Sequence, residues 1–229
     1  MEINTFNEGP LHAALKQRYA GRGAHLEVEI DGYVIDVVQD GLLIEIQTGG
    51  FSSLKKKLTA LLQSHAVRLV YPIAHEKWIV KLGDGGSGER SRRKSPKRGR
   101  LEHIFYELVS IPHLLAHPNF SLEVLLIQEE EHRRYDPHLR RGRGRWATEQ
   151  RLLLSVLERH LFDSPADLAL LLPPSLGDPF TTADLAQALE RRRQVAQKMA
   201  YCLRRLDVVT AVGKEGNAIL YQRSAPRPS

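Results

Sequence analysis

Three carboxylate side chains interrupt a strongly apolar stretch near the N-terminus. Glu27, Asp36 and Glu45 each stand inside a segment that alternates with the period of a β-strand. The segments are HLEVEI (25–30), YVIDVV (33–38) and LLIEIQ (42–47). Two Asp-Gly pairs, at 31–32 and 40–41, join them, and this dipeptide favours two-residue hairpin turns. The stretch is therefore predicted to form a three-stranded meander.

The two turns determine which residues face one another. If each Asp-Gly pair forms the loop of its hairpin, Asp36 lies opposite both Glu27 and Glu45. Opposed side chains on neighbouring strands have Cβ atoms about 5 Å apart. Three carboxylates this close repel one another or share protons unless a cation lies between them. Because all the ligands would be oxygens, the row predicts a hard cation, Mg²⁺ or Mn²⁺, rather than zinc.

The alternative interpretation is a solvent-exposed polar face, since half-exposed antiparallel sheets are common. Side-chain alternation places Val34, Val38 and Leu43 on the face that carries the row, which argues against full exposure. The opposite face is wholly apolar and is expected to pack on another layer of the protein. Its residues are Leu26, Val28, Ile30, Tyr33, Ile35, Val37, Leu42, Ile44 and Ile46.

Helices are predicted on both sides of the meander. Residues 8–20 carry apolar side chains at helical spacing, and residues 52–65 form a leucine stripe with a serine available as the N-cap. Two further strands are predicted at VRLVYPI (67–73) and KWIVKL (77–82). The order helix, three-stranded meander, helix, strand predicts an α/β (α+β) fold.

This order, with Asp36, Glu45 and Gln47 on the second and third strands, resembles the PD-(D/E)XK nuclease superfamily, the restriction-endonuclease-like fold. The resemblance covers roughly residues 5–82. The family's signature is an Asp on the second strand and (Asp/Glu)-x-Lys on the third, and Ile35 stands where the family often has Pro. The resemblance implies an αβββαβ core and a Mg²⁺- or Mn²⁺-dependent DNA endonuclease, with Asp36 and Glu45 as metal ligands.

The main departure from the signature is Gln47, which stands where the family has Lys. Glutamine can hydrogen-bond the attacking water but brings no positive charge. Under the resemblance, Lys55 or Lys57 of the next helix could supply that charge, although three solvated helix lysines are an equally good account. The family also often takes an acidic residue from its first helix, so Glu8 competes with Glu27 for an added acidic role in metal binding or catalysis.

Length and composition limit the class of protein. The chain has 229 residues, is 42% hydrophobic and carries a net charge of +6, which allows one large or two small folded domains. Its single cysteine, Cys202, excludes an intrachain disulfide. No apolar run approaches the roughly 20 residues that span a bilayer, and the N-terminus lacks a signal-peptide pattern. A cytoplasmic protein with no membrane partner is therefore expected.

Positive charge is concentrated in two segments. Residues 83–100 contain seven Lys or Arg and two Asp or Glu, and residues 132–146 contain six Arg and one Asp. Such segments suit a polyanion, most commonly nucleic acid, although two solvated linkers would have the same composition. We predict a nuclease-like domain at 1–131 that contains a mobile basic loop at 83–100, followed by a basic linker at 132–146.

The last third of the chain changes character. Its predicted helices are ATEQRLLLSVLERHLF (147–162), TTADLAQAL (181–189) and RRRQVAQKMAYCLRRL (191–206), and a hairpin that turns at GKEGN (213–217) follows them. This order resembles a winged helix-turn-helix domain over 147–223, with 224–229 as a tail. The resemblance implies that the helix at 191–206 reads DNA through its first turns. The DNA-binding candidates are Arg191, Arg192, Arg193, Gln194, Gln197 and Lys198.

The preferred function from the sequence is a metal-dependent DNA endonuclease that acts in restriction, defence or repair. The alternative is a nuclease-fold protein in which Gln47 marks lost catalysis, leaving a DNA-binding regulator or a subunit of a larger complex. A homodimer is compatible with the same features. The winged helix could also dock a protein partner instead of DNA.

Overall fold

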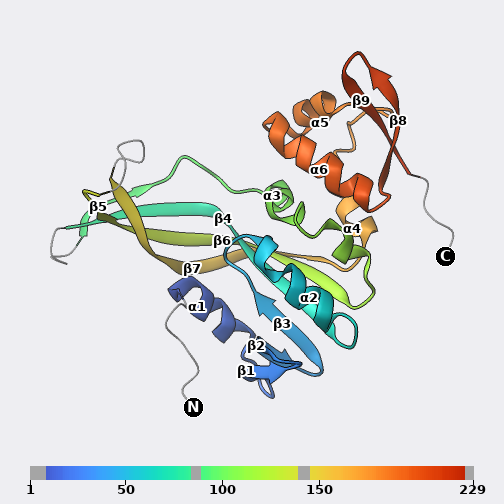
Figure 1. Cartoon of the computed structure of the whole chain (residues 1–229). Helices are drawn as coiled ribbons and strands as arrows, with labels where there is room; N and C mark the ends of the chain where they lie inside the picture. The colour runs from blue at the N-terminus through green and yellow to red at the C-terminus, as the bar shows by residue number, and fades with distance from the viewer. Residues whose placement is uncertain (1–8, 84–88, 139–144, 225–229) are drawn as a thin grey trace. The chain divides into compact units, whose positions relative to one another are not determined.

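The computed structural model describes residues 9–83, 89–138 and 145–224 (Figure 1). The chain divides into two compact units. Unit 1 comprises Met1–Thr48, Val70–Leu101 and Val124–His160, and unit 2 comprises Gly49–Leu69, Glu102–Glu123 and Leu161–Ser229. Each unit is therefore assembled from segments that are distant in the sequence.

Unit 1 contains one helix and most of a seven-stranded sheet (Figure 1). The helix is α1 (Pro10–Tyr19), and the strands are β1 (His25–Ile30), β2 (Tyr33–Gln39), β3 (Leu42–Ile46), β4 (Ala66–Leu82), β5 (Glu89–Lys94), β6 (Phe120–Tyr135) and β7 (Trp146–Phe162). The order across the sheet is β1-β2-β3-β4-β6-β7, and β5 pairs with β4. The predicted class of mixed α and β structure is confirmed.

The predicted meander and its register are also confirmed. β1 pairs with β2, and β2 with β3, both antiparallel and in the register that two-residue loops impose. Asp31 and Asp40, the first loop residues, have φ angles of 50° and 49°, and the glycines that follow them have positive φ as well. These are the conformations of type I′ turns. In this register Asp36 is level with Glu27 on one side and with Glu45 on the other.

Helix α1 covers the apolar face of the meander. Its buried side chains Leu11, Leu15 and Tyr19 belong to one apolar cluster with residues of β2, β3, β4 and β6. The strand residues are Val37, Ile44, Ile46, Val70, Leu125 and Ile127. The helix begins at Pro10, which suits the first helical position because it has no N–H group to satisfy. Glu8, predicted at the start of this helix, lies outside the described residues.

The structure corrects two predictions for the segment after the meander. VRLVYPI and KWIVKL are parts of one strand, β4, which continues through Pro72 and the residues between them. Residues 89–94 of the predicted mobile loop at 83–100 form β5, which pairs with the end of β4. Residues 84–88 of that loop lie outside the described part of the chain.

β5 forms without apolar residues because its backbone and its charges both find partners. Its sequence suggested a loop because Ser, Arg and Lys bury little apolar area. In the sheet, Arg92 donates to Glu130 at 2.7 Å, and Lys94 donates to Glu76 at 2.8 Å. The ladder with β4 and these ion pairs take the place of apolar packing.

The segment 147–162, predicted as a helix, is strand β7 at the edge of the sheet. Its Ala, Glu, Gln, Arg and Leu residues are good helix formers, so local propensity favours a helix. Pairing with β6 overrides that preference, and an ion pair between Arg151 and Glu129 joins the two strands. The predicted helix therefore belongs to the sheet and not to the C-terminal helices.

The predicted basic linker at 132–146 is corrected for the same reason. β6 continues to Tyr135 and β7 begins at Trp146, so this segment is a connection between adjacent strands. Residues 139–144 lie outside the described residues. Some of the arginines that suggested a linker are residues of β6. Their side chains pair with acidic neighbours, as Arg133 does with Glu131.

Unit 2 consists of short helices and a two-stranded hairpin (Figure 1). The elements are η1 (Phe51–Leu54), α2 (Lys55–Leu61), η3 (Leu101–Ile104), α3 (Phe105–Leu108), η4 (Pro112–Ala116), α4 (Pro165–Ala169), α5 (Thr182–Leu189), α6 (Arg193–Arg205), β8 (Val209–Glu215) and β9 (Ala218–Arg223). Thr181 caps α5, and with Asp184 it forms a capping box. The predicted serine cap before α2 is wrong: the N-cap of η1 is Gly50, with no side-chain hydrogen bond.

Helix α6 is the centre of unit 2. It contacts α3, α4, α5, η4 and β8, and six of its side chains are buried. They are Val195, Ala196, Met199, Ala200, Cys202 and Leu203. Among the helices of residues 9–83, 89–138 and 145–224, none is long and apolar enough to cross a membrane.

Candidate functional site

The β2–β3 ladder places Asp36 at an opening between the two strands. The ladder runs from Gln39–Leu42 to Val37–Ile44. Two positions further along β3, the backbone N–H of Ile46 donates to Oδ2 of Asp36 at 2.8 Å. A side-chain oxygen therefore takes the position that a backbone carbonyl would have in a continued ladder. This bond fixes the carboxylate of Asp36 against β3, on the strand that carries Glu45.

A histidine from α1 completes one side of this opening. Nε2 of His12 lies 3.3 Å from Oδ2 of Asp36, and both side chains are 20% exposed. His12 is held there because Leu11 and Leu15, its neighbours on the helix, are buried in the apolar cluster under α1. The opening therefore combines a carboxylate with an imidazole, a group that can accept or donate a proton near neutral pH.

Glu27 is directed to a different partner. Its φ angle is 53°, a left-handed conformation that departs from the extended backbone of β1. Nζ of Lys16 donates to Oε1 of Glu27 at 2.7 Å, and the Lys16 side chain is only 7% exposed. The negative charge of Glu27 is thus balanced by a buried ammonium group from α1.

Glu45 and Gln47 continue β3 past the opening. Glu45 is buried, with 5% of its surface exposed, and Gln47 is half-buried. The backbone N–H of Gln47 donates to the carbonyl of Val70 on β4 at 2.9 Å. Nη1 of Arg151 donates to the carbonyl of Thr48 at 3.3 Å. The end of β3 is therefore held from β4 and from β7.

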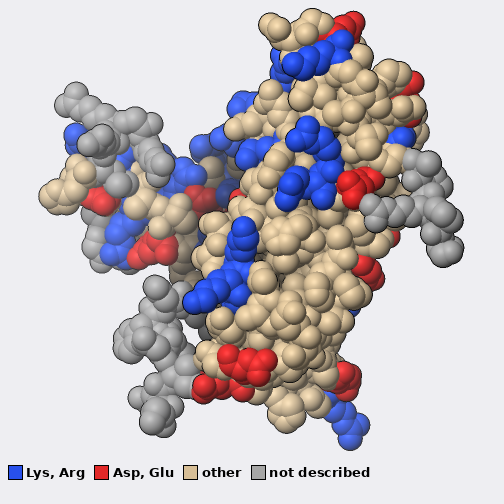
Figure 2. Space-filling view, turned by 45° about the vertical axis from the view of Figure 1, so that its right-hand side comes forward, with Lys and Arg blue, Asp and Glu red and all other residues tan. Residues whose placement is uncertain are grey.

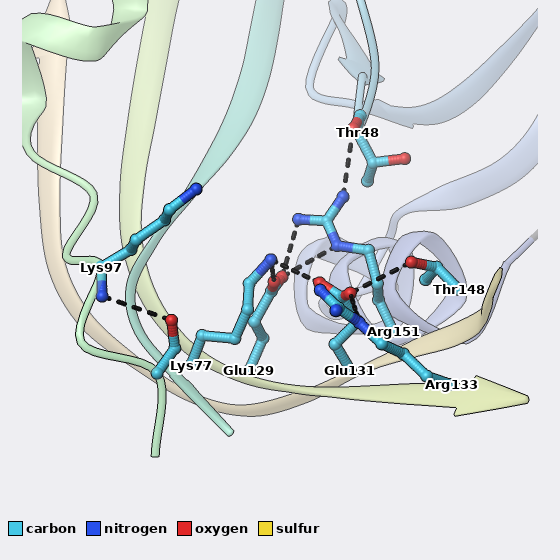
Figure 3. A network of polar contacts seen from close by, with 9 residues as sticks. Thr48, Lys77, Lys97, Glu129, Glu131, Arg133, Thr148 and Arg151 are labelled. Carbon is cyan, nitrogen blue, oxygen red and sulfur yellow. Dashed lines mark hydrogen bonds and ion pairs between the residues drawn. The ribbon is translucent and has the colours of Figure 1, made fainter. Parts of the chain in front are cut away.

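A second polar cluster surrounds the Arg151 contact (Figure 3). Glu129 is fully buried, and its Oε2 accepts from Nε of Arg151 at 2.9 Å and from Nη2 at 2.6 Å. Nζ of Lys77 lies 2.8 Å from the other oxygen of Glu129 and 2.6 Å from Oε2 of Glu131. Arg133 donates to Oε1 of Glu131 at 2.6 Å. We call these five residues the ionic network.

The ionic network favours the charged form of Glu131. Burial alone would raise the pKa of Glu131, but hydrogen bonds from Lys77 and Arg133 outweigh it and lower the pKa to about 2. Thr148 adds a third hydrogen bond to Glu131 at 3.0 Å. Because charge-assisted hydrogen bonds in a half-buried site are strong, these contacts tie β4, β6 and β7 together.

The remaining predicted residues lie in unit 2. Lys57 is half-buried on α2, and Lys55 and Lys56 are exposed. Of the residues proposed to read DNA, those that are exposed are Arg192, Arg193, Gln194 and Gln197. Arg191 and Lys198 are half-buried. Nζ of Lys198 lies 5.6 Å from the ring centroid of Tyr106, and Arg191 donates to the carbonyl of Glu190 at 2.7 Å. Fewer of these side chains are therefore exposed than the six that were predicted to contact DNA.

Three residues of the candidate site escaped the sequence analysis. They are His12, Lys16 and Arg151. His12 and Lys16 stand four positions apart on a predicted helix, so their place on one face was readable. That this face is turned toward the meander could be known only from the packing of Leu11 and Leu15 in the structure. Arg151 was hidden because its segment was predicted to be a helix.

The comparisons with known proteins bear on the family but not on a function. Residues 9–163 match the model of a family described as a domain of unknown function (DUF8091), which here spans α1 to the end of β7. The chain is 36% identical over 233 residues to an uncharacterized protein of Treponema pallidum (strain Nichols), with 99% of this chain and 89% of the relative covered. No solved structure matches. The chain therefore belongs to the DUF8091 family.

Proposed function

We propose that the protein is a Mg²⁺- or Mn²⁺-dependent DNA endonuclease whose active site is the opening between β2 and β3. The observation that carries the proposal is the position of Asp36 and Glu45. They are level with one another immediately past the last ladder pair, with Asp36 fixed by the N–H of Ile46. Two carboxylates on neighbouring strands, level with one another, are groups that can bind a divalent cation.

We propose that two carboxylates rather than three would hold the Mg²⁺ ion. In residues 9–83, 89–138 and 145–224 no three or more His, Cys, Asp or Glu side chains are grouped so as to hold a metal ion. Glu27 is engaged by Lys16, which removes it from the row. Mg²⁺ commonly binds through one or two carboxylates together with waters and substrate phosphate, so Asp36 and Glu45 are sufficient ligands. Such an ion would activate water and offset phosphoryl charge.

Other residues of the opening would act on the water and the leaving group. The side-chain amide of Gln47 can orient a water by hydrogen bonding. His12, beside Asp36, can take or give a proton during hydrolysis. Lys57 and Glu8 remain predictions for an added charge and an added acid, and Glu8 lies outside the described residues.

The fold-level resemblances support the same proposal. The order α1, β1–β3, α2, β4 is that of the restriction-endonuclease-like core. The helices α4, α5 and α6 followed by the β8–β9 hairpin have the order of a winged helix-turn-helix domain. We propose DNA as the partner of both parts, with α6 contacting it through Arg192, Arg193 and Gln197.

A second candidate function rests on Gln47. Gln47 stands where the PD-(D/E)XK superfamily has a lysine. The site therefore lacks a positive charge that this superfamily uses in catalysis. A nuclease-fold protein that binds DNA without cutting it, as a regulator or as a subunit of a complex, would have the same opening. The two candidates differ in one measurable step, cleavage of the phosphodiester bond.

The test is cleavage of supercoiled plasmid by the purified full chain with Mg²⁺ or Mn²⁺. We expect nicking or linearisation by the wild type, and a loss of at least about a hundredfold in Asp36→Ala and Glu45→Ala, because each removes a ligand of the charge-stabilising ion. Glu29→Ala is the matched control, since it removes an exposed carboxylate of β1 away from the opening.

Two results would contradict the proposal. Cleavage that persists in Asp36→Ala at the wild-type rate would place the activity outside the opening or in a contaminant. DNA binding by the wild type with no cleavage in either metal would favour the second candidate function.

A further inference from the structure

We propose that one face of the sheet extension formed by β4 to β7 is a binding surface for the DNA backbone. This inference rests on the proposed function only in taking DNA as the ligand. We define the arm as residues 76–82, 89–94, 128–135 and 146–151 of the four strands. In Figure 2 the surface of the arm carries basic and acidic side chains together, so the two faces of the arm must be separated by register.

The β4–β5 register assigns side chains to the two faces. Trp78 pairs with Lys94, and Val80 pairs with Arg92. The alternating pairs are Ile79–Arg93 and Lys81–Ser91. Because successive side chains of a strand point to opposite faces, Lys81 and Arg93 share the face opposite to Trp78. Ion pairs extend the assignment to β6.

We name the two faces by their charge. The cationic face carries Lys77, Lys81, Arg93, Glu129, Glu131, Arg133 and Trp146, since Lys77 reaches both glutamates and Lys81 lies over Trp146. The paired face carries Glu76, Trp78, Arg92, Lys94 and Glu130, since Lys94 reaches Glu76 and Arg92 reaches Glu130.

Charge is arranged differently on the two faces. On the paired face the acidic partners Glu76 and Glu130 are half-buried, and each has its own β5 cation. On the cationic face both carboxylates are buried at the base of the ionic network, and three cations meet these two acids. Lys77, Arg133 and Arg151 remain 26%, 31% and 29% exposed above them. The cationic face therefore presents an excess of positive charge to solvent.

Aromatic rings lie beside these cations at the outer part of the face. Nζ of Lys81 is 4.4 Å from the ring centroid of Trp146, and the ring of Tyr135 meets Trp146 edge to face at 5.7 Å. Tyr135 is 40% exposed, and its hydroxyl accepts from Arg145 at 3.2 Å. Cations interleaved with exposed aromatic rings are the composition of surfaces that follow a nucleic-acid backbone.

The cationic face leads away from the candidate active site. Arg151 of the ionic network holds the carbonyl of Thr48, directly after Gln47. Gln47 bonds to Val70, and Lys81 lies further along the same strand, so the strand rise of about 3.3 Å per residue gives a span of at most about 36 Å. At about 3.4 Å per base step, that span corresponds to at most about ten base steps of DNA.

The first test measures binding of labelled DNA to the full chain in EDTA, where cleavage does not interfere. The double variant Lys81→Ala/Arg93→Ala removes two charges from the cationic face, and Arg92→Ala/Lys94→Ala removes two from the paired face. We expect the first to weaken binding at least about tenfold at 0.1 M salt and to flatten the salt dependence by about two counterions. We expect the second to change binding less than about twofold. Thermal unfolding of each variant confirms that it is folded.

Probe length and strandedness sharpen this test. The loss in Lys81→Ala/Arg93→Ala should be full on a 30-base-pair duplex, which is longer than the largest possible span, and smaller on an 8-base-pair duplex, which makes fewer contacts. A single-stranded probe of the longer length tells whether the face follows one strand or a duplex. A loss on single strands alone assigns the face to unpaired DNA, and a loss on both assigns it to the phosphate backbone.

The chain's two tryptophans provide a second measurement that needs no loss of charge, since they lie on opposite faces. In Trp78→Phe the emission comes from Trp146, and in Trp146→Phe it comes from Trp78. DNA should quench Trp146 and leave Trp78 nearly unchanged. Equal quenching of both, or equal affinity losses in the two double variants, would overturn the inference.

The outcomes separate this inference from the proposed nuclease. Binding that depends on the cationic face, without cleavage in any metal, would support the inference and reject the nuclease. Cleavage that depends on Asp36, with no effect of Lys81→Ala/Arg93→Ala, would do the reverse. Absence of binding to every DNA probe at low salt would overturn the binding surface.

Discussion

Unit 1 contains two acidic clusters whose charges are held by different kinds of partner. Glu129 and Glu131 are paired with three long cationic side chains, of which Lys77 reaches β6 from β4 and Arg151 reaches it from β7. Asp36 is held by a backbone N–H of β3 and by the imidazole of His12. The first arrangement is a structural tie. The second fixes the position of a carboxylate with a rigid dipole and a titratable ring, which suits a site that gains and loses a cation.

The comparison shows that acidic residues are poor guides to function until their partners are known. The run Glu129–Glu131 is as acidic as the row at Glu27, Asp36 and Glu45, yet its outer members are balanced within the sheet. Removing a carboxylate from each cluster should therefore have opposite consequences. Loss from the ionic network should cost stability, and loss from the opening should cost cation binding.

The largest effect on stability is expected for Glu129→Gln. Glu129 is fully buried, and its neutralisation removes the charge that Arg151 pairs with and leaves Lys77 with Glu131 alone. Breaking a buried ion pair in this way costs about 3 kcal/mol or more. Urea unfolding of this variant and of the control Glu158→Gln, which changes an exposed residue of β7, measures the difference. An equal loss in both variants would show that the network does not tie the strands.

A smaller, pH-dependent effect is expected at Glu131. Its pKa is lowered from 4.5 to about 2 in the folded state, so its contribution to stability is present above about pH 4.5 and is lost as pH falls toward 2. At pH 7 the free energy of unfolding of the wild type should exceed that of Glu131→Gln by about 1–2 kcal/mol. This value is lower than the pKa shift alone implies, because solvent reaches Arg133 and weakens its ion pair. Urea unfolding at several pH values should show the two proteins converging in acid. A constant difference down to pH 2 would contradict this account.

The smallest effect is expected for Lys16→Met, which keeps the apolar stem of the side chain and removes its charge. The Glu27 side chain is 34% exposed and can turn to water, so the loss of stability should be about 1 kcal/mol. If Glu27 is not a ligand, Mn²⁺ affinity should stay unchanged in this variant. A clear rise in affinity would mean that Lys16 competes with a cation for Glu27. The cation would then have three carboxylate ligands, as the sequence predicted.

Much of the meander could be predicted from the sequence because its signals are local. Asp-Gly at 31–32 and 40–41 determines the loops, and the loops determine the register that brings Asp36 level with Glu45. The same holds for the Thr181 cap of α5 and for the β8–β9 hairpin. In each case a few neighbouring residues are enough to select the conformation.

The arm could not be predicted because its signals are non-local. β7 has the composition of a helix, and β5 has the composition of a loop. Both become strands by pairing with neighbouring strands, and β5 gains ion pairs with Glu76 and Glu130, which lie 18 and 38 residues from their partners. The contact of Lys16 with Glu27 likewise depends on how α1 packs on the sheet. The third carboxylate of the predicted site was thus lost to a tertiary contact that no local pattern contains.

Calorimetric titration with Mn²⁺ tests the central claim that the β2–β3 opening is a divalent-cation site. We expect the wild type to bind, and Asp36→Asn and Glu45→Gln each to lose at least about tenfold in affinity while remaining folded. Glu29→Gln, the exposed control on β1, should bind as the wild type does. Wild-type affinity in both Asp36→Asn and Glu45→Gln, or no binding by the wild-type protein, would contradict the account.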